Sequence, residues 1–154
     1  MSPVMSMEEA IVERWVEKSL SSYPAQTHSF LRGEPDPFRN PVGHTLRRSL
    51  GVLVREILGE MDKHRLAEAL DAIVRVRAVQ NFSPAEAVCF VFLLRAAIQE
   101  TTGAISEALH HRIDELALMA FDLYMSCREQ IFDLRVNELR GRMRQAAFSE
   151  GKTE

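Results

Sequence analysis

The stretch from Ile105 to Ala147 contains one glycine and no proline, and it constrains the fold more than any other feature of the chain. Such a stretch is free to form one continuous α-helix about 65 Å long. A compact domain of this size has a radius of gyration of only about 15 Å. We therefore expect a long C-terminal helix, part of which leaves the body of the domain.

Apolar residues in this stretch follow two successive patterns, each alternating steps of four and three residues. The first predicts packing against the domain's own core and comprises Ile113, Ala117, Ala120, Tyr124, Cys127, Ile131 and Leu134. The second is displaced by one residue and comprises Phe132, Val136, Leu139, Met143 and Ala146. It is typical of a short coiled-coil seam, which needs a second chain or another domain to cover it.

Upstream, the sequence predicts four further helices, over residues 7–21, 41–61, 64–80 and 83–99. Three start signals support them: Ser6 with Glu9, Asn40 with Pro41, and Ser83-Pro84 with Glu86. The run from Ala87 to Leu94 is apolar on nearly every side, which indicates a helix at the centre of the core. Residues 25–40 hold several prolines and a glycine, so we expect a loop whose apolar members Phe30, Leu31 and Phe38 pack back onto the helices.

The predicted fold is therefore a single all-α domain over residues 1–154, a bundle of about five helices with a long last one. We place its core at about residues 7–130 and its projecting tail at about residues 131–148. Arg77 is unusual, because it lies on the inward face of its helix, four residues beyond Ile73. A cation there must extend to solvent, pair with a carboxylate or face a cavity, and the first two readings are the simplest.

Composition and motifs argue against several functions. The net charge of −3 gives no global attraction for nucleic acid, and the tail arginines (Arg135, Arg140, Arg142 and Arg144) are more typical of the flank of a coiled coil. The five histidines lack metal-ligand spacing, and no nucleophile or phosphate-loop motif occurs. We therefore expect no enzymatic activity, metal or cofactor. No secretory signal or membrane-spanning run is apparent, which favours a cytoplasmic protein.

Two segments carry a family resemblance: residues 36–43, Asp-Pro-Phe-Arg-Asn-Pro-Val-Gly, and residues 73–88, which lead into the apolar helix. With the helix of Trp15 and the tail over residues 124–137, the chain resembles the RsbRD N-terminal-like domain of RsbR-type stressosome co-antagonist proteins. The resemblance implies a globin-like helical fold that binds no haem, forms homodimers and serves as a sensory input domain. In the stressosome proteins the last helix continues into a STAS domain, whereas this chain ends at Glu154, so we expect a signal to pass through a partner protein.

The resulting hypothesis is a non-catalytic regulatory module, homodimeric, that senses an unknown cue. The candidate seam for the dimer or partner is Phe132, Val136, Leu139 and Met143, and the candidate ligand or structural site is Arg75, Arg77 and Phe38. The alternative is a relative of the globins that does bind haem or another redox cofactor, with His64, His110 or His111 as axial ligand. A third possibility, a small DNA-associated regulator, would use the arginines of the tail.

Overall fold

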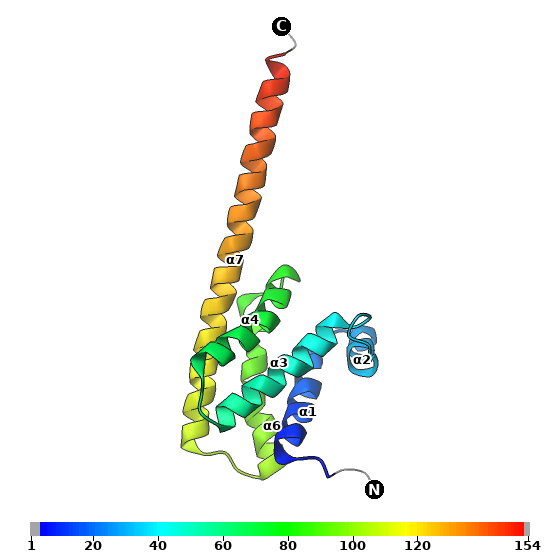
Figure 1. Ribbon diagram of the computed structural model, residues 1–154, viewed down its shortest axis with the longest axis vertical. Helices are drawn as coiled ribbons and strands as arrows, with labels where there is room; N and C mark the ends of the chain where they lie inside the picture. Colours follow the sequence, from blue (N-terminus) through cyan, green and yellow to red (C-terminus); the bar gives the residue numbers. More distant parts are fainter. Residues whose placement is uncertain (1–3, 153–154) are drawn as a thin grey trace.

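The computed structural model describes residues 4–152, and within that range all the regular secondary structure is helical. Its elements are α1 (Met7–Leu20), α2 (Ala25–Gly33), α3 (Pro41–Leu58), α4 (Lys63–Val79), α5 (Pro84–Val88), the 3₁₀ turn η1 (Cys89–Val91), α6 (Leu93–Thr102) and α7 (Glu107–Glu150). Figure 1 shows a compact body from which α7 projects far to one side. The predicted all-α fold with a long C-terminal helix is confirmed.

The three start signals read from the sequence act as expected, because each depends only on residues within one turn. Ser6 Oγ accepts from the backbone N–H of Glu9, and Glu9 accepts from the backbone N–H of Ser6. Ser83 and Glu86 form the same reciprocal pair in front of α5. Asn40 caps α3 by accepting from the backbone N–H of Gly43 at 2.9 Å.

The prediction of a loop over residues 25–40 is wrong for its first half, which forms α2. This helix escaped notice because Pro24, before its first turn, offers no side-chain cap and only Leu31 is buried along it. Of the three apolar residues expected to pack onto the helices, Leu31 is buried, whereas Phe30 is 47% exposed. Phe38 is 95% exposed, in the turn that joins α2 to α3.

The prediction of one central helix over residues 83–99 is also wrong. The chain forms the short helix α5, tightens into η1 and then continues as α6. Phe90 and Val91 are buried in the break, whereas Phe92 is about half exposed. The apolar run is therefore divided between two helical segments joined by a 3₁₀ turn.

The core lies where α3 and α4 pack on each other, with α1 and α6 on one side and α7 on the other. Trp15 and Phe90 are among its largest fully buried side chains. The first apolar pattern of α7 faces this core, as predicted, from Ile113 to Cys127. The pattern ends earlier than expected, because Leu134 is 67% exposed and lies beyond the body.

Candidate functional site

Arg77, the first of the residues singled out from the sequence, is buried in α4 with only 2% of its surface exposed. Its Nη1 donates a 2.9 Å hydrogen bond to the carbonyl oxygen of Glu86. Its guanidinium carbon lies 5.2 Å from the ring centre of Phe82 and 5.0 Å from that of Phe90. The expected solvent exposure or carboxylate partner is not found, because aromatic faces and a carbonyl surround the cation instead.

Burial lowers the pKa of Arg77, an effect that nearby Tyr23 partly offsets. Arginine stays protonated in proteins, so the positive charge persists. Its Nη2 has no hydrogen-bond partner among the described residues, and Arg77 borders a cavity of about 10 Å³ also lined by Tyr23 and Ile73. That volume is close to the smallest that holds a single water molecule. In this conformation the cavity beside Arg77 has no room for an organic ligand.

Arg77 instead joins two other side chains in fixing the segment from Phe82 to Phe90. Trp15 of α1 donates a 2.6 Å hydrogen bond to the carbonyl of Phe90, and Tyr124 of α7 donates one of 2.5 Å to the carbonyl of Phe82. Three helices thus supply donors to three carbonyls of one short segment. This arrangement satisfies buried acceptors around the helix break and locks α5 and η1 to the body.

The other two members of that candidate group lie elsewhere. Arg75 is exposed on a different face of α4, where it pairs with Asp71 at 3.2 Å. Phe38 stands at the α2–α3 turn, held by the bond of its backbone N–H to Asp36 Oδ1. The structure therefore does not bring Arg75, Arg77 and Phe38 together into one pocket, and a ligand role for them stays a prediction.

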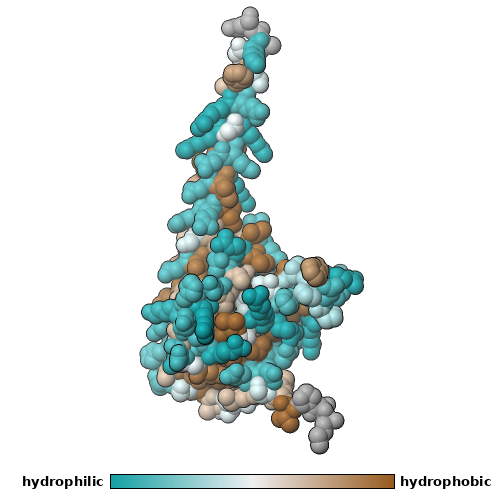
Figure 2. Space-filling model, viewed as in Figure 1, coloured by the Kyte–Doolittle hydropathy of each residue, from teal (hydrophilic) through white to brown (hydrophobic). Residues whose placement is uncertain are grey.

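The candidate seam lies on the projecting half of α7. Phe132, Leu139 and Met143 are 66%, 58% and 73% exposed, and Val136 is half-buried. Figure 2 shows apolar patches on this part of the helix between hydrophilic side chains. All four residues lie on a single helix, so the structure brings them together as one surface.

The apolar surface also extends backward along α7, which the sequence analysis missed. Leu118 and Met125 precede Phe132 by fourteen and seven residues, and they are 68% and 39% exposed. Phe121, in the same half of the helix, is 46% exposed. We call Leu118, Met125, Phe132, Leu139 and Ala146 the heptad line. The seven-residue spacing was visible in the sequence, but only the structure shows that Leu118 and Met125 face away from the core.

The described residues hold no group of three or more histidine, cysteine, aspartate and glutamate side chains placed to bind a metal ion. Of the three histidines considered as haem ligands, His64 and His111 are exposed and His110 is half-buried. His64 lies 3.2 Å from Glu68 at the surface of α4. Across residues 4–152, no helix is both long and apolar enough to span a bilayer.

Comparison with known proteins gives two matches. The model of the RsbT co-antagonist protein RsbRD N-terminal domain matches residues 9–139. An uncharacterized protein of Archaeoglobus fulgidus is 29% identical over 136 residues, which cover 83% of this chain and 82% of that protein. No solved structure matches the chain. Because the family match spans most of the sequence, this chain belongs to the RsbRD N-terminal domain family.

Proposed function

We propose that this chain is a non-catalytic regulatory module that dimerises along α7 and transmits a signal through a partner protein. The observation that carries the proposal is the heptad line with Val136 and Met143 beside it. Membership of the RsbRD N-terminal domain family, which is associated with stressosome-type regulatory proteins, supports the same class of function.

The spacing of the heptad line favours a second helix as its occupant. Apolar residues that repeat every 3.5 positions on average keep to one side of a helix only if two helices wind around each other. The line extends from Leu118 to Ala146, about 42 Å along the axis. Exposure of these apolar side chains to water is unfavourable, and a partner helix would bury them.

The arginines beside the heptad line support association with a particular partner helix rather than with any apolar surface. Arg135, Arg140, Arg142 and Arg144 are all exposed, with Glu138 among them. Charged residues at the edges of a coiled coil select which helix is accepted and in which orientation. We assign the tail arginines to this role rather than to nucleic acid.

Sedimentation velocity on the full chain tests the proposal. Replacing both Val136 and Leu139 by Asp places two carboxylates in the seam, so the dimer is expected to dissociate into monomers. Leu118→Asp tests the newly found end of the line and is expected to weaken the dimer in the same way. The matched control is Leu134→Asp, an equally exposed leucine on another side of α7, which should leave the dimer intact.

Circular dichroism should show all variants folded, since none of these side chains lies in the core. A wild-type chain that is monomeric at all concentrations, or a dimer that the Val136 and Leu139 pair of substitutions leaves unchanged, would contradict dimerisation along α7.

A further inference from the structure

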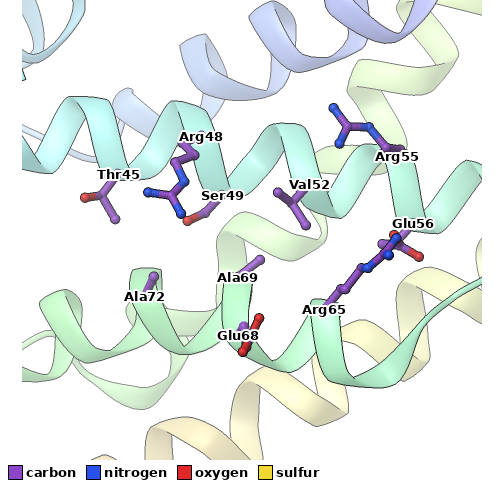
Figure 3. A pocket seen from close by; sticks show the side chains of 10 residues that line it. All are labelled: Thr45, Arg48, Ser49, Val52, Arg55, Glu56, Arg65, Glu68, Ala69 and Ala72. Carbon is purple, nitrogen blue, oxygen red and sulfur yellow. The ribbon is translucent and has the colours of Figure 1, made fainter.

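The groove between α3 and α4 is lined by polar side chains, several of which make no hydrogen bond or ion pair with any described residue. It has a volume of about 570 Å³, within the range of roughly 300–1,000 Å³ that small-molecule sites occupy. Figure 3 shows Thr45, Arg48 and Ser49 along the side of α3, with Ala69 and Ala72 opposite them on α4. The two alanines leave open the space that larger side chains on α4 would fill.

Ser49 is the first sign that this groove is a binding site. The residue is only 7% exposed, and its hydroxyl makes no hydrogen bond with any described residue. Other helical hydroxyls in this chain, such as those of Ser29 and Thr101, donate to the carbonyl four residues earlier. Ser49 makes no such bond, and it lines the groove together with Arg48, as Figure 3 shows. The oxygen is not one of the fully buried side-chain atoms that lack a partner, so it is accessible from the groove and free to donate to a bound acceptor.

The charges around Ser49 indicate the sign of the missing partner. Of the three arginines that line the groove, Arg65 is occupied, because it pairs with Glu56 across the groove at 3.2 Å. Arg48 and Arg55 make no ion pair with any described residue. Arg48 extends toward α4, whereas Arg55 is turned away from it at the other end of the groove.

The carboxylates of the groove do not cancel this positive charge. Glu56 is the partner of Arg65, and Glu68 is 70% exposed at the rim beside His64. The end of the groove at Thr45, Arg48 and Ser49 therefore combines one unpaired guanidinium with two hydroxyls, spaced at i, i+3 and i+4 on one helix face. A guanidinium donates two parallel hydrogen bonds to a carboxylate or phosphate, and hydroxyls complete such a cradle.

We propose that this groove binds a small organic oxyanion, whose carboxylate or phosphate group is held by Arg48, Ser49 and Thr45. The ligand's remaining atoms lie along Val52 and the alanines of α4. This inference rests on the proposed sensory function and assigns its ligand site. Because α4 also packs against α7, an occupant of the groove touches a helix that supports the dimer surface.

Calorimetric titration of the full chain with inorganic phosphate, 3-phosphoglycerate and succinate tests the proposal. We expect saturable binding of at least one of these probes, with one site per chain. The phosphate and succinate arms separate a phosphate-specific site from a carboxylate-specific one. Arg48→Gln is expected to weaken binding about tenfold or more, and Ser49→Ala to weaken it severalfold, because each removes donors to the anion.

The matched control is Arg47→Gln, which removes the same charge from the same helix. Arg47 pairs with Glu13 of α1 and does not line this groove, so the affinity should stay unchanged. Absence of saturable binding for all three probes, or equal affinity in the wild type and Arg48→Gln, would overturn the proposal. The dimer is measured separately by sedimentation: a dimer with a groove that binds none of the probes refutes the ligand site alone. Binding by a chain that does not associate along α7 refutes the dimer alone.

Discussion

The indole Nε1 of Trp15 donates a hydrogen bond of 2.6 Å to the carbonyl oxygen of Phe90, and the two rings stack with their centres 6.1 Å apart. The residues are 75 positions apart in the chain, and both are fully buried. One contact therefore joins α1 to the 3₁₀ turn that interrupts the apolar run. The contact fixes η1, the break between α5 and α6 that the sequence pattern did not predict.

Trp15→Phe is predicted to lower the free energy of unfolding by about 1–3 kcal/mol, because it leaves the buried Phe90 carbonyl without its donor. Urea unfolding followed by circular dichroism measures this loss, since the substitution removes the only tryptophan of the chain. Tyr23→Phe is the control: its hydroxyl bonds to Gln80 at an exposed position, so it should cost at most about 0.5 kcal/mol. Equal effects of the two substitutions would contradict the anchoring role of Trp15.

Two glycines of α3 are predicted to respond in opposite directions to the same substitution. A Cβ added at Gly43 would lie 2.6 Å from the carbonyl oxygen of Leu31 and 2.4 Å from the side chain of Asn40, whereas one at Gly51 meets nothing within 4 Å. Gly43→Ala should therefore destabilise the protein by about 1–3 kcal/mol. Gly51→Ala should stabilise it by about 0.5–1 kcal/mol, because alanine is the better helix former.

The midpoints of thermal unfolding check this pair of substitutions. No loss of stability in Gly43→Ala would show that α2 and the start of α3 are not packed as described, and a loss in Gly51→Ala would show that the space beside Gly51 is not open. The test is sensitive because Asn40 also donates to the carbonyls of Leu31 and Glu34, so displacement of its side chain disturbs three hydrogen bonds at once.

Glu100 is predicted to make stability depend on acid pH. A hydrogen bond from Lys18 and its charge, followed by a hydrogen bond from Arg14 and its charge, hold the pKa of this carboxyl below its usual value. A folded-state pKa below the unfolded one means that the folded protein binds fewer protons. The stabilisation is therefore present above the unfolded pKa and is lost as the pH falls through the lower folded pKa.

Comparing urea midpoints at pH 7 and pH 3 for the wild type and Glu100→Gln measures this contribution. The variant should lose less stability on acidification than the wild type does. Glu115→Gln is the control, because Glu115 is exposed on α7 and forms no ion pair with any described residue. An identical acid response in the wild type and Glu100→Gln would show that the links from α1 to α6 do not form.

Features that depend on residues close together in the sequence were predicted correctly, and features that depend on distant residues were not. The caps at Ser6, Asn40 and Ser83 were predicted correctly, because each bond joins residues three positions apart. The helix α2 was missed, because it has neither a side-chain cap nor a buried stripe to mark it.

The candidate sites divide in the same way. The apolar spacing of Phe132, Leu139 and Met143 predicted an exposed surface on α7, and these residues are exposed. Nothing in the sequence pointed to Ser49, since a serine in a helix usually bonds to its own backbone. Its lack of a partner and its place in the groove emerge only when α3 and α4 are brought together.

The sequence by itself determined that this chain is all helical, that its last helix outgrows the domain, and which family it belongs to. The first two properties depend on local caps, on periodicity and on the absence of proline after Pro84, whereas the family rests on the resemblance of residues 36–43 and 73–88 and on the match over residues 9–139. Only the tertiary structure decided that Arg77 lies between Phe82 and Phe90, that the apolar run breaks at η1, and that the heptad line extends back to Leu118. The physical reason is that each of these features depends on contacts between segments that are distant in the sequence. A local pattern predicts which residues are buried, but not which residues they contact.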